Sequence, residues 1–307
     1  MLIISHSEDI DGILSAALAI RKAKKERESY SLLLMDYTEY DLLIDKIKNS
    51  KENRIMILDI GMDESKSKEV IEALRNSKSF IIWIDHHIWE NSTIKEASKY
   101  CNLIIGKNSA TFIFSRIFSN DLFSRKLARI AEDSDFFKNK LKISKQLSII
   151  ITYFNAFSKE KLYWLAEYFS ENTKLTKEME ETAEKIEKEI EKTRKEAEKS
   201  LEIIEIQKKK IGIIELPKVL NPSFEGNRLI NEKKLNTCVM LFKSEKGYKV
   251  SIRGEKALEL AKLLGGGGHP NAAGAFLESN NERERIKQNI LLIFGSDSGP
   301  DSNSKTL

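Results

Sequence analysis

Residues 79–87 read SFIIWIDHH, an apolar run that ends abruptly in Asp85, His86 and His87. The run is short, rich in isoleucine and free of glycine and proline, which is typical of a strand buried on both faces. It predicts a central strand whose last residues carry one carboxylate and two imidazoles.

Two earlier segments have the same form. Residues 2–6, LIISH, are followed by Asp9 and Asp11. Residues 54–60, RIMILDI, contain Asp59 near the end of the apolar run. The carboxyl ends of parallel strands meet at one edge of a sheet, which is where such sheets bind their ligands. We therefore expect these acids and imidazoles to gather at one edge.

Helical segments separate the predicted strands. Apolar residues recur with helical spacing after each strand, in residues 11–27, 40–47 and 65–75. Alternating strands and helices predict an α/β domain with a parallel sheet and helices on both faces. We place this N-terminal domain at residues 1–172.

A charged segment follows this domain. From Leu175 to Ile204 the less polar residues recur about every 3.6 positions among Glu, Lys and Arg, which predicts a linker helix over residues 173–207. Helical pairing with a second chain is the alternative. Residues 208–295 combine short strands and helices and predict a smaller mixed α/β domain, and the tail 296–307 is predicted to be disordered.

Composition restricts the class of protein. The chain has 307 residues, of which 41% are hydrophobic and 32% charged, with a net charge of +4. These values exclude a disordered chain, and no apolar run is long enough to span a membrane, so no membrane partner is expected. Cys101 and Cys238 are the two cysteines, too few for a disulfide framework, and they favour a cytoplasmic location.

The polar residues at the strand ends predict a metal centre. The four histidines, His6, His86, His87 and His269, all lie at strand ends or beside glycines. Carboxylates gathered at one edge would repel one another unless cations neutralise them. Oxygen and imidazole ligands suit Mn²⁺, or Mg²⁺ as the alternative, and paired divalent ions are a common device for phosphoester hydrolysis. The alternative is that each aspartate only caps a helix.

A glycine run marks the second domain. The run comprises Gly265, Gly266, Gly267 and Gly268 and is followed by His269. Glycines allow positive φ and close backbone approach, so their amides can bind a phosphate. His269 and Arg253 add donors, and arginine can bind a phosphate through two parallel hydrogen bonds. The alternative is a flexible hairpin turn.

These motifs resemble those of a known family. HSEDIDG from His6, the single Asp59, the triplet at 85–87 and Asp133 in AEDSDFF are similar to motifs I to IV of the DHH phosphoesterase superfamily. The segment from Ser251, SIRG followed by GGGGHPNAAGA, is similar to the glycine-rich motif of its companion DHHA1 domain. The matches occur in the family's order over residues 4–275. Length and domain plan resemble nanoRNase or pAp-phosphatase enzymes and compact archaeal RecJ-like exonucleases.

The resemblance implies a role for each matching residue. The implied metal ligands are His6, Asp9, Asp11, Asp59, His86 and Asp133. Asp59 would bridge two Mn²⁺ ions. His6, Asp9 and Asp133 would complete the first site, and Asp11 and His86 would complete the second. Two alternatives stay open, Glu8 in place of His6 and Asp135 in place of Asp133.

The remaining motif residues would act on the substrate. The resemblance implies that His87 and Asp85 orient the water or contact the scissile phosphate. It also implies that the glycine run, His269 and Arg253 hold the terminal phosphate or base of a nucleotide.

The expected activity is a Mn²⁺-dependent exonuclease or phosphodiesterase that hydrolyses short single-stranded RNA or DNA to nucleoside monophosphates. One alternative is an enzyme for pAp or for linear or cyclic dinucleotides. The other is a non-catalytic RecJ-like replication scaffold, which the full set of acid and imidazole positions disfavours. A homodimer or a replication or repair partner is compatible with the pattern.

Overall fold

The computed structural model describes residues 1–136, 138, 140–244, 247–278 and 282–295. The chain divides into two compact units, Met1–Glu187 and Lys188–Leu307. The predicted tail at 296–307 lies outside the described residues. No helix in the described part of the chain is long and apolar enough to cross a membrane.

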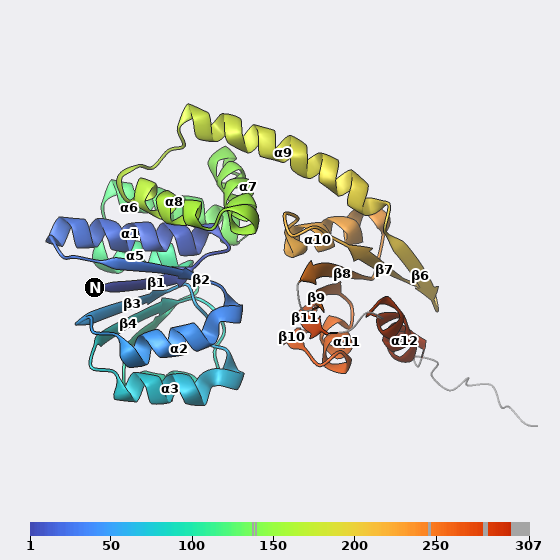
Figure 1. The fold of residues 1–307 in the computed structure, drawn as a ribbon, viewed down its shortest axis with the longest axis horizontal. Coiled ribbons are helices and arrows are strands. Elements are labelled where there is room, and N and C mark those ends of the chain that lie inside the picture. Colours follow the sequence, from blue (N-terminus) through green and yellow to red (C-terminus); the bar gives the residue numbers. More distant parts are fainter. Residues whose placement is uncertain (137, 139, 245–246, 279–281, 296–307) are drawn as a thin grey trace, which may run out of the picture. The chain divides into compact units, whose positions relative to one another are not determined.

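The first unit contains a five-stranded parallel sheet (Figure 1). Its strands are β1 (Leu2–His6), β2 (Ser31–Met35), β3 (Arg54–Leu58), β4 (Phe80–Asp85) and β5 (Asn102–Ile105). Their order in the sheet is β2-β1-β3-β4-β5, so the three strands that carry the predicted site are central neighbours. The predicted parallel α/β domain is confirmed.

Helices cover both faces of this sheet (Figure 1). One face packs against helices α1 (Ile10–Glu26), α5 (Ala110–Phe118), α6 (Leu122–Asp135), α7 (Lys142–Phe157) and α8 (Glu160–Glu171). The other packs against α2 (Tyr40–Asn49), α3 (Ser67–Asn76) and α4 (Asn91–Ala97). Successive strand residues point to opposite faces, so Ile82 and Ile84 enter the first core while Ile81 and Trp83 enter the second. This double burial explains the continuous apolar runs.

The turn from β1 into α1 depends on a glycine. The Asp9 carboxylate caps α1 by accepting a hydrogen bond from the Gly12 amide. A Cβ atom on Gly12 would lie 2.2 Å from the carbonyl oxygen of His6, which only glycine avoids. This close approach fixes His6, Asp9 and Asp11 around one turn.

The charged helix is shorter than predicted. Helix α9 spans Lys177–Glu198, and residues 202–206, expected to be helical, form strand β6 (Glu202–Ile206). Three isoleucines favour a strand here, and β6 pairs with β7 (Lys209–Glu215) as a hairpin. Both turn residues, Gln207 and Lys208, have positive φ, as in a type I′ turn, but lack the glycine or asparagine that usually signals it.

The second unit is the mixed α/β fold that was predicted (Figure 1). Its other strands are β8 (Thr237–Ser244), β9 (Gly247–Gly254), β10 (Gly267–His269) and β11 (Ala272–Leu277), in the order β10-β11-β9-β8-β7-β6. Only the β7–β8 pair among these is parallel. Helices α11 (Ala257–Leu263) and α12 (Glu282–Gly295) bury one face, and α10 (Pro222–Lys233) packs on β8 and β9.

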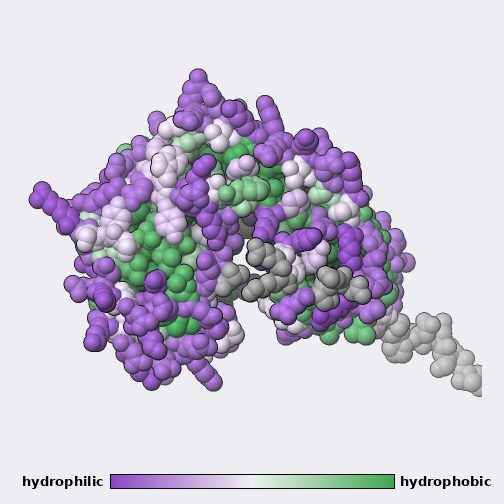
Figure 2. Space-filling view, in the orientation of Figure 1, coloured by the Kyte–Doolittle hydropathy of each residue, from purple (hydrophilic) through white to green (hydrophobic). Residues whose placement is uncertain are grey.

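The surface of the first unit is not uniformly hydrophilic. On the face drawn in Figure 2, hydrophobic side chains of the first unit show around α1 and β2, among hydrophilic helices. Strand β2 is an edge strand, and its leucines at 32 and 33 are half-buried. The charged face of α9 remains hydrophilic, consistent with its run of glutamates and lysines.

Candidate metal centre

The strand ends bring the predicted site residues together. Strand β1 ends at His6, β3 ends one residue before Asp59, and β4 ends at Asp85, directly before His86 and His87. Asp59 has a φ of 55°, which is uncommon for a residue other than glycine, and its amide still donates to the carbonyl of Ile84. This left-handed turn is a strained feature of the kind found at functional sites.

Asp59 lies at the centre of the cluster. One carboxylate oxygen is 3.2 Å from Nε2 of His86, and the other is 3.7 Å from Nδ1 of His6. The side chain is 1% exposed, yet neither oxygen accepts a well-aligned hydrogen bond from any described residue. Burial and the nearby charges of Asp9 and Asp11 raise its pKa well above the usual range. A buried carboxylate with two unsatisfied oxygens is the environment that a bound cation would complete.

The first group of ligand atoms comprises His6, Asp9 and Asp59, all within 4.8 Å of one another. Nδ1 of His6 is 2.9 Å from the Asp9 carboxylate, while Nε2 is buried and without a hydrogen-bond partner. Burial lowers the pKa of His6, but the carboxylates of Asp9, Asp59 and Glu8 outweigh it and raise that pKa well above 6.5. Glu8, the alternative to His6, lies 3.8 Å from Nε2 of this histidine and contacts Asn155.

The second group comprises Asp11, His86 and Asp135. Nε2 of His86 is 3.5 Å from Asp135 and 3.9 Å from Asp11. Burial lowers the pKa of His86, but Asp59, Asp135 and Asp11 raise it to about 10. Burial and the charge of Asp11 raise the pKa of Asp135 to about 7, and its buried Oδ2 has no hydrogen-bond partner among the described residues.

The structure does not bring Asp133, the acid preferred from the sequence, into this cluster. Its two carboxylate oxygens accept hydrogen bonds from the amides of Lys140 and Leu141 and from the hydroxyl of Ser144. These donors satisfy the carboxylate at the start of α7, so Asp133 ties two helices together. Of the two acids in this motif, Asp135 is the one that faces His86.

Asp11 serves the fold as well as the cluster. Its oxygens accept hydrogen bonds from the amides of Ala110, at 2.5 Å, and Thr111, at 2.9 Å, at the start of α5. Helix N-terminal amides stabilise a carboxylate, although burial still raises the pKa of Asp11. The alternative reading of these aspartates as helix caps is thus correct in part. Asp9 caps α1 and Asp11 binds the start of α5, while both face the cluster.

His87 is oriented by a buried carboxylate. Asp85 is fully buried and accepts hydrogen bonds from Nδ1 of His87, at 2.8 Å, and from the Trp89 indole, at 2.6 Å. Nε2 of His87 lies 3.2 Å from the hydroxyl of Tyr37, a residue that the sequence reasoning missed. Its position two residues after the carboxyl end of β2, at the same sheet edge, was the signal that could have identified it.

Arg253, in the second unit, has no acidic partner among the described residues. Its guanidinium donates to the hydroxyls of Ser223, at 2.8 Å, and Ser251, at 3.0 Å. A Cβ atom on Gly226 would lie 2.7 Å from Cγ of Arg253, so this glycine makes room for the arginine beside α10. A half-buried guanidinium near the start of a helix, without a carboxylate, is suited to an anion.

The glycine run forms a tight turn and an edge strand. Gly265 and Gly268 have positive φ values of 84° and 138°. Cβ atoms on Gly266 and Gly268 would lie within 3 Å of the backbone of β11, so both positions need glycine. Gly267, Gly268 and His269 form β10, an exposed edge strand with only β11 as a neighbour, so backbone groups on its other side are open to a ligand.

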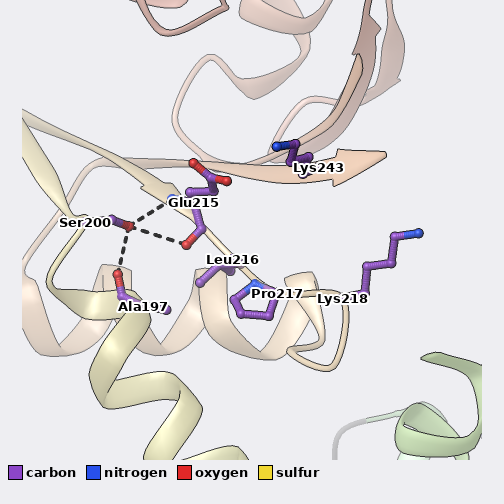
Figure 3. A pocket seen from close by; sticks show the side chains of 7 residues that line it. All are labelled: Ala197, Ser200, Glu215, Leu216, Pro217, Lys218 and Lys243. Atoms are coloured by element: carbon purple, nitrogen blue, oxygen red, sulfur yellow. Dashed lines mark hydrogen bonds between the residues drawn. The ribbon is translucent and has the colours of Figure 1, made fainter. Parts of the chain in front are cut away.

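A pocket of about 330 Å³ lies elsewhere in the second unit, where the end of α9 meets β7. Its lining includes Ser200, Glu215, Lys218 and Lys243, and Ser200 is already hydrogen-bonded to Ala197 and Glu215 (Figure 3). None of the predicted site residues lines it.

Similar solved structures agree with this fold. RecJ from Thermus thermophilus in complex with Mn²⁺ has a TM-score of 0.63 at 12% identity, covering 96% of this chain and 52% of that one. CDC45 from Entamoeba histolytica has a TM-score of 0.59 at 9% identity, covering 96% and 95% of the two chains. An exopolyphosphatase-related protein from Bacteroides fragilis has a TM-score of 0.54 at 16% identity, covering 94% and 90%. At these identities the likeness shows the fold alone.

Family comparisons match both parts of the chain. No curated protein sequence matches it significantly. The DHH family N-terminal domain matches residues 1–131, and the DHHA1 domain matches residues 226–295. The two matches, in the order predicted from the motifs, place the chain in the DHH/DHHA1 superfamily, whose members are typically phosphoesterases.

Proposed function

We propose that this protein is a Mn²⁺-dependent phosphodiesterase that hydrolyses short single-stranded oligonucleotides to nucleoside monophosphates. The observation that carries the proposal is Asp59, a buried carboxylate with two unsatisfied oxygens between His6 and His86. A charge buried in this way is costly unless a cation pairs with it. The proposal places one ion at His6, Asp9 and Asp59 and a second at Asp59, Asp11, His86 and Asp135.

The donor set fits hard divalent ions. Most of the available atoms are carboxylate oxygens, joined by one imidazole in each group, and no thiol belongs to either group. This chemistry suits Mn²⁺ or Mg²⁺ better than a thiolate zinc site. When bound, such ions would polarise the phosphoryl oxygens and offset the negative charge that develops during hydrolysis.

The chain's own residues supply the remaining groups. Asp85 holds Nδ1 of His87 as the proton donor, which leaves Nε2 of neutral His87 as an acceptor. In the proposal this nitrogen orients the water by accepting its hydrogen bond, whereas a protonated His87 would donate a hydrogen bond to the phosphate. In the second unit, Arg253 and the open edge of β10 would bind the phosphate or base of the nucleotide, since arginine and free amides both suit an anion.

Relatives support this substrate class. The structures with similar folds include RecJ in complex with Mn²⁺ and an exonuclease RecJ bound to manganese. A structure of CDC45 also has a similar fold. The alternative function for this chain is that of a non-catalytic replication scaffold.

One experiment separates these functions. The purified protein is incubated with Mn²⁺ and end-labelled RNA and DNA of 2 to about 20 nucleotides, and with pAp in parallel. Release of mononucleotides from the oligonucleotides supports the proposal, and the order of label release gives the polarity. Cleavage of pAp or of dinucleotides alone would replace it with a small-nucleotide enzyme. Mn²⁺ binding without hydrolysis of any phosphoester would favour the scaffold.

A further inference from the structure

Tyr37 contacts two imidazoles of the candidate centre. It is the first residue of the short helix η1 (Tyr37–Glu39), two residues after the end of β2. Its ring centroid lies 4.9 Å from that of His6, and its hydroxyl lies 3.2 Å from Nε2 of His87. The side chain is 40% exposed, so it borders the open side of the site.

The direction of each hydrogen bond follows from its neighbours. The Asp85 carboxylate can only accept, so Nδ1 of His87 carries the proton and Nε2 of the neutral ring is an acceptor. The Gly61 amide donates to the Tyr37 oxygen at 3.3 Å, which leaves the phenolic proton for Nε2. A chain of hydrogen bonds therefore runs from Gly61 through Tyr37 and His87 to Asp85.

Gly61 also packs against the histidine ring. A Cβ atom at position 61 would lie 2.9 Å from Cβ and Cγ of His87. The same glycine thus contacts the ring and donates to the tyrosine that holds its far nitrogen. His87 is fixed at both nitrogens, although it belongs to a group with Asp59, Asp85 and His86 whose ligand atoms lie within 4.8 Å.

We propose that Tyr37 is a positioning residue that acts through His87. Its hydroxyl holds the neutral ring at Nε2 while Asp85 holds it at Nδ1, so the ring keeps one orientation beside the residues that would bind the ions. A water that replaces the hydroxyl at Nε2 then finds the ring already oriented to accept its hydrogen bond. The inference rests on the proposed phosphoesterase function for its effect on catalysis, but not for the hydrogen bond itself.

Tyr37→Phe tests the hydroxyl alone because the phenyl ring can still pack on His6. Tyr40→Phe is a matched control, since Tyr40 is buried and its hydroxyl donates to the carbonyl of the same Gly61 without touching His87. The ¹⁵N resonances of the His87 ring are recorded on the Mg²⁺-loaded protein at alkaline pH, where the ring is neutral. Metal content and hydrolysis of bis-p-nitrophenyl phosphate are measured on the same samples.

We expect the Nε2 resonance of His87 to move in Tyr37→Phe and to stay in place in Tyr40→Phe. We also expect kcat to fall about tenfold in Tyr37→Phe, with KM and metal content unchanged. An unmoved resonance overturns the inference, and so does a moved resonance with unchanged kcat. A wild-type protein without any phosphoesterase activity would instead refute the proposed function, and the resonance would still decide whether Tyr37 fixes His87.

Discussion

Asp133 and Asp135 lie two positions apart at the end of α6 and face opposite ways. Asp135 approaches His86 to 3.5 Å, whereas Asp133 accepts hydrogen bonds from the start of α7. Two helical positions correspond to a rotation of about 200°, so both carboxylates cannot face one site. The two acids look equivalent in the motif, but one lies near His86 and the other is hydrogen-bonded to the start of α7.

Asp135→Asn and Asp133→Asn should therefore have different effects. In Asp135→Asn, Mn²⁺ bound per chain should fall from two ions toward one, because a carboxylate of the second group is lost. In Asp133→Asn, metal content should be kept, while the free energy of unfolding falls by about 1–3 kcal/mol through weakened hydrogen bonds to Ser144 and the α7 backbone. Elemental analysis and chemical denaturation distinguish the two. Metal loss confined to Asp133→Asn would restore Asp133 as the ligand.

Asp59→Asn should make the metal-free protein more stable than the metal-free wild type. The wild-type carboxylate is buried and accepts no well-aligned hydrogen bond from any described residue. Its pKa is raised by burial and by Asp9 and Asp11, so a neutral amide relieves repulsion. The expected gain is about 1–3 kcal/mol. The variant should in turn lose the rise in Tm that Mn²⁺ gives the wild type. Thermal unfolding with chelator and with Mn²⁺ measures both effects.

The control for this prediction is Asp45→Asn, which removes an exposed carboxylate bonded only to the neighbouring Asn49 side chain in the described part of the chain. It should leave the Mn²⁺-induced rise in Tm intact. If Asp59→Asn keeps that rise and hydrolyses at the wild-type rate, Asp59 does not bridge two ions.

Metal binding should release protons at mildly alkaline pH. Asp59, Asp135 and Asp11 raise the pKa of His86 to about 10 against the effect of burial, and carboxylates also raise that of His6. A pKa of about 10 means that the ring of His86 still carries the extra proton at about pH 8, and an imidazole must lose it to bind a metal. Mn²⁺ titrations should thus release about one to two protons per chain.

Calorimetry in two buffers of different ionisation enthalpy measures this release, because the observed heat then differs between buffers. His86→Ala should lower the release by about one proton. Equal heats in both buffers would mean that the imidazoles are already neutral before the metal binds.

His86→Ala and His87→Ala should separate binding from catalysis. Nε2 of His86 faces Asp59, Asp135 and Asp11, so its removal should reduce metal content and abolish turnover. Both nitrogens of His87 are already hydrogen-bonded, to Asp85 and to Tyr37, so its removal should lower turnover and leave the ions in place. Removal of one positioned acid–base group typically costs about 10²–10⁴-fold. Metal loss in His87→Ala alone would exchange the two roles.

Much of the fold was predictable from local pattern. Apolar runs buried on two faces and alternating with helices determine a parallel sheet, and the acids at the ends of β1, β3 and β4 had to meet at one edge. The end of α9 was missed because the turn at Gln207 and Lys208 adopts positive φ without glycine or asparagine. Leu201 and Ile204 continued the helical spacing by coincidence.

The site was harder to predict where tertiary contacts determine which residues face it. The choice between Asp133 and Asp135 depends on the start of α7, which supplies the hydrogen-bond donors that bind Asp133. Tyr37 lies two residues after β2, and its place at the site becomes visible only because β2 lies beside β1. Neither the hydrogen-bond donors of Asp133 nor the position of Tyr37 at the site can be predicted from the spacing of residues along the chain.

Arg253→Ala should impair capture of oligonucleotides and leave the metal centre unchanged. The guanidinium donates to hydroxyl and carbonyl groups but has no acidic partner in the described part of the chain, so it can bind a phosphate. Loss of a desolvated, charged contact costs about 2–4 kcal/mol, or roughly 30- to 1,000-fold in kcat/KM. The loss should be large for di- to pentanucleotides and small for bis-p-nitrophenyl phosphate, which needs the metal centre alone.

Controls separate this role from support of the fold. Arg283→Ala removes a partly exposed arginine of the same unit, 3.9 Å from Glu202, and should leave both activities unchanged. Ser223→Ala removes one hydrogen bond from Arg253 and keeps its charge, so the loss for oligonucleotides should be smaller than in Arg253→Ala. A contact made equally in ground and transition states would raise KM, and one made only in the transition state would lower kcat. If Arg253→Ala reduces both activities equally, the arginine supports the fold, and the phosphate must bind elsewhere.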